Sequence, residues 1–151
     1  MSLLRVLVAS MAVAVAVFST ACDESLSSVT GPTPNLAPTF SSIQREIFET
    51  TDASGRGMCT NCHTNVGRNP SGGLNLTAGN SYGALINIAS GARPGAVRVI
   101  PGDPDNSYLV KKLDDSRDIT GVRMPRGEGP FLTPGQLLVI RRWIAQGAPN
   151  N

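Results

Sequence analysis

The 151-residue sequence is poor in several residue types, and each shortage limits what the protein can be. It has a single histidine. Because aromatic residues make up only 5% of the chain, side chains alone can build only a thin apolar core. A small domain with such a core is usually stabilised by disulfides, a metal or a bound group. The 16 glycines and 11 prolines place much of the backbone in turns.

Charge and cysteine are also scarce. The 13 basic and 11 acidic side chains nearly cancel, whereas a nucleic-acid partner requires a strongly basic surface, so none is expected. The three cysteines, Cys22, Cys59 and Cys62, are an odd number. Because a closed set of disulfides cannot use all of them, at least one cysteine has another role.

The N-terminal stretch, residues 1–21, has the pattern of a secretory signal peptide. Arg5 precedes an apolar run over residues 6–18, and small residues follow at positions 19–21. The run is shorter than the roughly 20 apolar residues of a transmembrane helix, and a retained membrane anchor is the alternative. We therefore expect an exported protein in an oxidising compartment.

Cys22 stands where a bacterial lipoprotein signal places its acylated cysteine. Residues 18–22 resemble a lipobox, although Ser19 replaces the usual Leu, Val or Ile, and a free N-terminus is the alternative. Lipidation gives Cys22 a role, and the Ser, Thr and Pro of residues 22–38 then form a flexible tether. The expected location is the periplasm, where the lipid anchors the protein to a membrane without spanning it. Asp23 favours the inner membrane by analogy with enterobacterial sorting.

Residues 39–151 are expected to form one domain. No alternating pattern indicates a sheet, and Gly/Pro-rich loops separate several helical patterns. The predicted fold class is all-α, with about four short helices. The first begins at the cap Ser41, which forms a capping box with Gln44, and ends before Gly55; the second covers residues 81–89, the third runs from a cap at Asp105 or Asn106 to about Leu113, and the last ends at Gly147.

The last helix has the clearest start signals. Thr133 supplies the N-cap, Pro134 occupies the first helical position, and Gln136 completes a capping box. The expected apolar stripe of this helix consists of Leu137, Ile140 and Ile144, with Leu138 and Trp143 on its flanks.

Residues 59–63, Cys-Thr-Asn-Cys-His, form a C-x-x-C-H motif, the attachment motif for c-type haem. The two thiols add across the haem vinyl groups as thioethers, and His63 presents its imidazole to the iron. Covalent attachment retains the cofactor outside the cytoplasm, and haem supplies apolar surface that the sequence lacks. The motif predicts one haem c, bound through Cys59 and Cys62.

Other uses of the motif are weaker. A zinc site lacks a fourth ligand, because only His63 and the distant Cys22 are available besides the motif cysteines. A thioredoxin-like dithiol requires a βαβ pattern that is not present. A plain disulfide leaves His63 without a role.

The second axial ligand is predicted by elimination. Because His63 is the only histidine, a bis-histidine haem within one chain is excluded, and thioether sulfur is the usual alternative. Two methionines leave with the signal peptide, and Met58 adjoins the attachment motif. Met124 remains, in a loop stiffened by Pro125; its alternative role is a core filler.

Several of these features together resemble a monohaem, class I type c cytochrome over roughly residues 40–148. The resemblance implies an all-α fold around one haem, with His63 on one side of the iron and Met124 on the other. It also implies that the second ring nitrogen of His63 donates to a backbone carbonyl, for which Pro70 is the candidate. The features are the first helix, the motif at 59–63, the turn Pro101-Gly102-Asp103-Pro104, Met124-Pro125, where Arg126 replaces a second proline of the family, and the closing residues 143–148.

Two classes of function remain open. With both axial positions filled the iron only changes oxidation state, which predicts one-electron transfer to redox protein partners, as a carrier or as a tethered module of a larger system, and no enzyme activity. A gas sensor or a peroxidase-like protein requires an open or labile sixth position instead. Arg123 and Arg126 flank Met124 and either pair with a haem propionate or an acidic partner, or are solvated.

Overall fold

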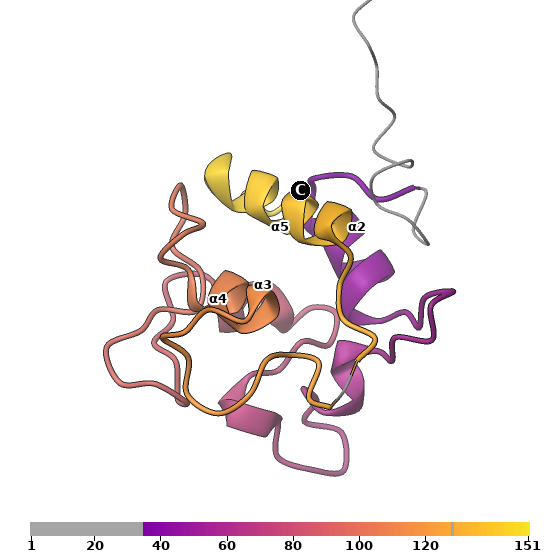
Figure 1. Cartoon of the computed structure of the whole chain (residues 1–151), viewed down its shortest axis with the longest axis horizontal. Helices are drawn as coiled ribbons and strands as arrows, with labels where there is room; N and C mark the ends of the chain where they lie inside the picture. The colour runs from indigo at the N-terminus through magenta and orange to yellow at the C-terminus, as the bar shows by residue number, and fades with distance from the viewer. Residues whose placement is uncertain (1–34, 128) are drawn as a thin grey trace, which may run out of the picture.

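A computed structural model of the chain describes residues 35–127 and 129–151 (Figure 1). The predicted signal peptide, Cys22 and most of the predicted tether lie outside the described residues. The described part is helical and contains isolated β-bridges but no strand, which confirms the all-α prediction at that level. Its elements are α2 (Phe40–Ile43), a π-helical turn η1 (Gln44–Phe48), the 3-10 turns η2 (Cys59–Asn61) and η3 (Ser71–Gly73), α3 (Ser81–Leu85), α4 (Tyr108–Asp114) and α5 (Pro134–Ala145).

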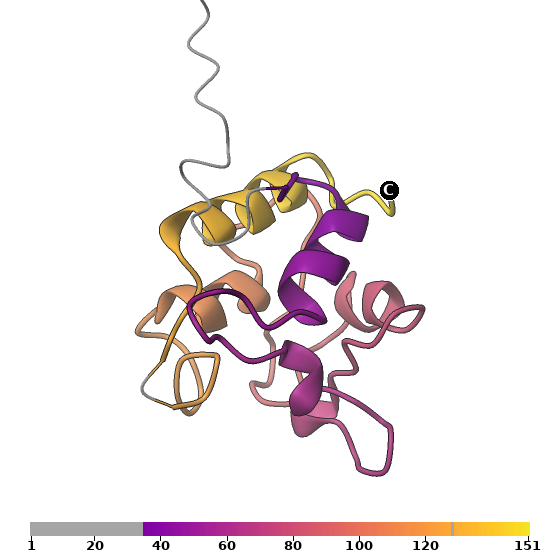
Figure 2. The ribbon, with the colours of Figure 1, turned by 90° about the vertical axis from the view of Figure 1, so that its right-hand side faces the viewer.

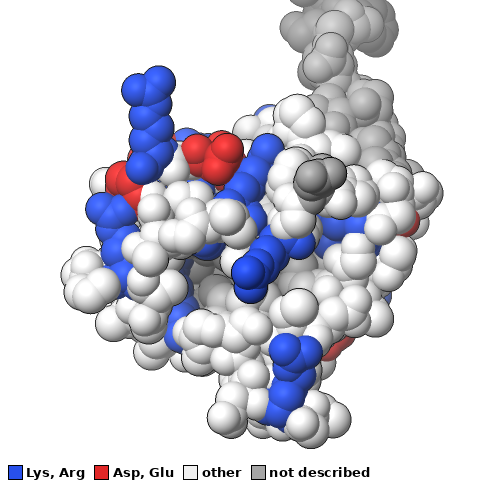
Figure 3. Space-filling model, turned by 60° about the horizontal axis from the view of Figure 1, so that its bottom comes forward, with Lys and Arg blue, Asp and Glu red and all other residues white. Residues whose placement is uncertain are grey.

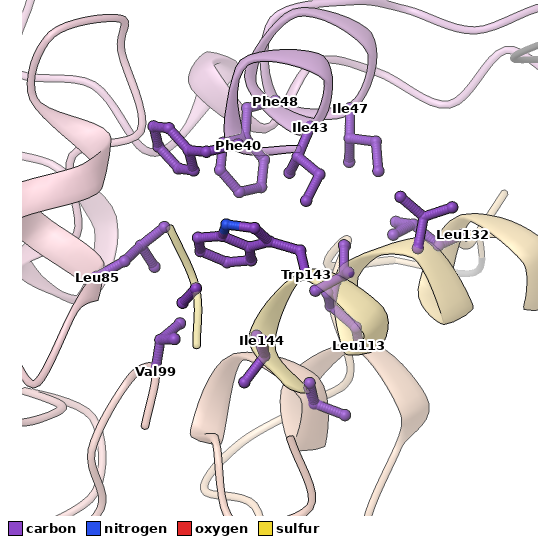
Figure 4. Packing of buried hydrophobic residues seen from close by; sticks show 14 of the residues in the cluster. Phe40, Ile43, Ile47, Phe48, Leu85, Val99, Leu113, Leu132, Trp143 and Ile144 are labelled. Carbon is purple, nitrogen blue, oxygen red and sulfur yellow. The ribbon is translucent and has the colours of Figure 1, made fainter. Parts of the chain in front are cut away.

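The core lies where α5 crosses α2 and η1 (Figures 1 and 2). Trp143 of α5 is completely buried, its ring centroid lies 5.4 Å from that of Phe40, and its indole N–H donates to the Pro149 carbonyl over 2.9 Å. Figure 4 shows apolar side chains of α2, η1 and α5 gathered around this ring. Large aromatic side chains bury the most apolar area per residue, so this one tryptophan offsets much of the shortage of aromatics.

The packed part of the chain begins before the predicted boundary at residue 39. Leu36 is 3% exposed and belongs to the core cluster, and the Ala37 amide donates to the Ser42 hydroxyl over 3.0 Å. The last residues of the predicted tether are therefore part of the folded domain.

The start of α5 is as predicted, but its buried face is different. The Thr133 hydroxyl accepts the Gln136 amide and the Gln136 side chain accepts the Thr133 amide, which completes the capping box behind Pro134. Ile140 and Ile144 are buried as predicted, but Leu137 is only partly buried, and the prediction that Trp143 lies on the flank of the stripe is wrong. Because α5 rests on α2 through Trp143, its buried face is centred on that residue and consists of Gly135, Gln136, Val139, Ile140, Trp143 and Ile144.

The predicted capping box of the first helix is also wrong. The N-cap is Thr39, whose hydroxyl accepts the Ser42 amide over 3.3 Å. Gln44 instead serves the core, since its side-chain amide donates to the Leu76 carbonyl over 2.9 Å and its oxygen accepts the Ser81 hydroxyl. A buried amide costs free energy unless it is bonded, and these two partners bond it.

The second predicted helix is shorter than expected. Helix α3 ends at Leu85, whose carbonyl accepts the Val99 amide, and Asn87 then takes a left-handed conformation with φ of 55°. An isolated bridge joins Ile86 to Val99. Pairing with the segment near residue 99 thus replaces the last predicted turn.

The third predicted helix begins later than expected. Its cap is Ser107, because the two predicted caps have other partners: the Asp103 carboxylate binds both the amide and the side chain of Asn106, and Asp105 pairs with Arg141. Buried Ser107 donates to the Asp103 carbonyl over 2.7 Å, which closes the turn over residues 101–104 onto α4.

Candidate functional site

A cavity of about 800 Å³ brings together the site residues predicted from the sequence. Cys59, Cys62, His63 and Met124 all line it. Its volume lies within the range of about 300 to 1,000 Å³ usual for cofactor pockets. Most of its wall is apolar and continuous with the core, with contributions from Ile47, Phe48, Leu85, Leu109, Leu113 and Leu132.

The C-x-x-C-H motif forms a tight turn at one side of the cavity. The Cys59 carbonyl accepts the amides of Cys62 and His63 over 3.2 and 3.0 Å. Both cysteines are free thiols, with Cys59 partly buried and Cys62 exposed, and burial raises the pKa of the Cys59 thiol. A neutral thiol at Cys59 suits an apolar wall, and so does a neutral thioether.

His63 is held by backbone carbonyls at one ring nitrogen. Its Nδ1 lies 3.0 Å from the Ser71 oxygen and 3.3 Å from the Leu74 oxygen. Both partners only accept, so Nδ1 carries the proton and Nε2 keeps its lone pair. Burial lowers the pKa of His63, which favours the neutral ring that binds a metal. The resemblance pointed to Pro70 as the acceptor; the acceptors are Ser71 and Leu74, on the same loop.

Arg98 fixes the loop that holds His63, and sequence reasoning missed it. Its guanidinium donates to the Ala84 carbonyl over 2.8 Å and to the carbonyls of Gly72 and Gly73 over 3.1 and 3.0 Å. Both glycines have positive φ, which turns their carbonyls toward one side chain. Arg98 thus joins α3 to η3, and no local sequence signal marks it.

The segment that carries Met124 is attached to α4. Its amide donates to the Lys112 carbonyl over 2.7 Å, and Lys112 Nζ donates to the carbonyls of Thr120 and Val122. Met124 both lines the cavity and packs against the core cluster. In Figure 2 the Cys59–Asn61 turn and the loop at residues 121–127 lie at two sides of the lower half of the molecule.

The arginines beside Met124 differ in their surroundings. Arg123 donates to the Leu113 carbonyl over 2.8 Å and lies 4.2 Å from the centre of the Phe131 ring, so it is attached to the fold rather than solvated. Arg126 lines the cavity.

The charged residues that line the cavity in the described part of the chain are all basic: Arg68, Arg98, Lys112 and Arg126. Figure 3 shows lysine and arginine side chains around a hollow on the face it displays. These cations suit a ligand with negatively charged groups.

Another cavity, of about 340 Å³, contains none of the predicted site residues; Arg93, Tyr108, Lys111 and Asp118 are among its lining. Over residues 35–127 and 129–151, no group of three or more His, Cys, Asp or Glu side chains is placed to hold a metal ion. No helix in this part of the chain is long and apolar enough to cross a membrane.

Comparisons with protein-family models, with curated proteins and with solved structures find no match to this chain.

Proposed function

We propose that this protein is a single-haem c-type cytochrome that transfers one electron at a time in the bacterial cell envelope. The observation that carries the proposal is the cavity of about 800 Å³, which Cys59, Cys62, His63 and Met124 all line. These residues come from two distant segments of the chain. A chance C-x-x-C-H sequence has no reason to face an apolar cavity of cofactor size.

The residues of the cavity fit haem c in three respects. The apolar wall is suited to the macrocycle, and the two cysteines stand at its edge for thioether attachment. The protonated Nδ1 of His63 is bonded to carbonyls, which orients the ring and leaves Nε2 for the iron. The positive charge of the lining suits the two propionates of haem.

Met124 is proposed as the second axial ligand. When bound, haem supplies an iron that alternates between the ferric and ferrous states. With His63 and Met124 both holding the iron, no site would be left for a substrate, so the protein would act as a carrier or as a tethered haem module that exchanges electrons with redox protein partners. Enzyme activity is not part of the proposal.

The proposed location is the periplasm, with Cys22 lipidated and the protein anchored to a membrane, the inner one by the analogy based on Asp23. The signal-peptide pattern of residues 1–21 supports export.

Optical spectra of the full chain, matured in cells that attach c-type haem, test the proposal. We expect haem that survives extraction with acidified acetone, a low-spin spectrum, the weak near-infrared band of a methionine–iron bond, and no reaction with carbon monoxide. Absence of attached haem contradicts the proposal and returns Cys59 and Cys62 to a dithiol role. A high-spin haem that binds carbon monoxide readily favours the sensor or peroxidase alternative.

A matched pair of variants tests the ligand. Met124→Ala is expected to lose the near-infrared band and to bind carbon monoxide, whereas Met58→Ala, at a methionine that lines the same cavity beside the attachment motif, retains the wild-type spectrum. Equal effects of the two substitutions contradict ligation by Met124.

A further inference from the structure

A completely buried arginine lies three positions before the first motif cysteine. Arg56 has no exposed surface, and its Nη1 donates to the carbonyls of Ile47 and Gly57 over 3.1 and 3.2 Å. The same nitrogen contacts the Cys59 sulfur at 4.0 Å, and Nη2 donates to the Thr50 carbonyl over 3.4 Å. One guanidinium therefore joins η1, the following loop and the cysteine.

The charge of Arg56 is balanced by one buried carboxylate. Arg56 Nε donates to Asp52 Oδ2 over 3.0 Å, and both side chains are almost inaccessible to solvent. Gln136 of α5 donates to the same oxygen over 3.2 Å, while the amide and hydroxyl of Ser54 donate to Asp52 Oδ1. This Asp52–Arg56–Gln136 network connects the end of the Cys59 side chain to α5.

Stability alone gives little reason for such a network. Removing an ion pair from water is costly, and apolar residues of similar volume usually stabilise a core as well or better. The position of the pair is therefore the informative feature, since its positive member touches the sulfur of a haem-attachment cysteine.

We infer that Arg56 is a positioning residue of the proposed haem site, which fixes Cys59 and places a buried positive charge that favours the reduced haem. The inference rests on the proposed function. Reduction adds one electron to the haem, and a positive charge nearby stabilises the product more than the reactant. Asp52 opposes the effect, but among the contacts of the network only Arg56 reaches the sulfur. The charge of Arg56 therefore prevails, and the reduction potential rises.

Potentiometric titration of the haem-loaded full chain tests this role. Arg56→Gln removes the positive charge and is expected to lower the potential, whereas Asp52→Asn removes the opposing charge and raises it. Arg56→Lys retains the charge and keeps a potential close to that of the wild type. Arg142→Gln, on the exposed side of α5, is the control for loss of one surface charge and leaves the potential nearly unchanged because solvent screens it.

Arg56→Gln leaves the buried Asp52 carboxylate without its ion-pair partner. If this variant does not fold, the double variant Asp52→Asn/Arg56→Gln takes its place in the test. It leaves no unpaired buried charge, and its potential is expected below that of the wild type and far below that of Asp52→Asn. A merely structural role predicts that both single variants lose stability. It does not predict that removing the positive charge lowers the reduction potential while removing the negative charge raises it.

The inference is overturned if Asp52→Asn and the double variant have the same potential, or if the buried substitutions shift it no more than Arg142→Gln. A wild-type chain without covalent haem contradicts the proposed function itself. A wild-type chain that carries haem, with a potential indifferent to these charges, contradicts only the role of Arg56.

Discussion

The amide of Met124 donates to the carbonyl of Lys112 over 2.7 Å, so the loop that carries the predicted ligand is attached to α4 by its own backbone. The Lys112 ammonium adds bonds to the carbonyls of Thr120 and Val122 at the approach to Met124. Lys112 thus restrains this loop through both its backbone carbonyl and its side chain.

We therefore expect Lys112→Met to loosen the loop at residues 121–127, here called the methionine loop, without removing the predicted ligand Met124. Loss of two hydrogen bonds from a partly exposed ammonium weakens the closed loop by about 1 kcal/mol. A fraction of the ferrous protein should then bind carbon monoxide, and the near-infrared band should weaken. Spectra with carbon monoxide measure both effects.

Lys111→Met is the matched control for this prediction, because Lys111 is the preceding residue of α4 and its ammonium pairs with the Asp118 carboxylate instead of the carbonyls of Thr120 and Val122. It should leave the spectra unchanged. If both lysine variants bind carbon monoxide to the same extent, the loop is not held by Lys112.

Arg98 is expected to stabilise the surroundings of His63. Its three bonds to the carbonyls of Ala84, Gly72 and Gly73 connect α3 to the loop that accepts from the imidazole. Arg98→Ala should lower the free energy of unfolding by about 1 to 3 kcal/mol, since hydrogen bonds from a charged group are lost. It should also speed hydrogen exchange at the Leu76 amide, which donates to the His63 carbonyl.

Chemical denaturation and amide exchange measure these two effects, and Arg142→Ala at an exposed position of α5 supplies the control. If the Leu76 amide of Arg98→Ala exchanges no faster than that of the wild type, Arg98 does not stabilise the loop at residues 71–74 that holds His63.

Features that depend on neighbouring residues were predictable from the sequence. The capping box of α5 needs only Thr133 and Gln136, three positions apart, and it forms as expected. The C-x-x-C-H segment forms one turn, because its hydrogen bonds join residues only three and four positions apart. Short-range geometry leaves such segments few alternatives.

Features that depend on distant partners were not predictable. Gln44 has the right spacing for a capping box with Ser41, yet its amide bonds Leu76 and Ser81, because burial demands partners that only the tertiary fold provides. Trp143 lies at the centre of its buried face because Phe40 lies opposite it.

The candidate site shows the same division. The motif cysteines and His63 form a local pattern, but Arg98 reaches that site from a distant segment. Arg56 precedes the motif by only a few positions, yet its burial depends on Asp52 and on Gln136 of a distant helix. Because the sequence does not show these contacts, Arg56 looks there like any other basic residue in a loop.

The role of Cys22 can be tested apart from the folded domain. If the cysteine is lipidated, the mature protein partitions into the membrane fraction, and its N-terminal peptide carries the mass of a diacylglyceryl cysteine. Cys22→Ser should release the domain into the soluble periplasmic fraction while its haem spectrum stays unchanged. A wild-type protein already soluble, with an unmodified N-terminus, supports ordinary signal-peptidase cleavage instead.

Acid should unfold the protein partly through Asp52. Burial raises the pKa of Asp52, but hydrogen bonds from Ser54 and Gln136 and the charge of Arg56 outweigh it and bring the pKa below its ordinary value of 3.8. The unfolded chain therefore takes up this proton at a higher pH than the folded one. The stability that Asp52 contributes is complete above its unfolded pKa and is lost as the pH falls through the folded value.

Asp52→Asn should consequently be less stable than the wild type at neutral pH, and its unfolding free energy should depend less on pH below about 5. Denaturant titrations between neutral pH and the acid transition measure this dependence. Asp115→Asn is the control, because Asp115 is exposed and its left-handed backbone accepts asparagine readily. If both variants keep the wild-type slope in acid, the carboxylate of Asp52 does not contribute to the acid sensitivity, and the buried pair gives the fold no pH-dependent stability.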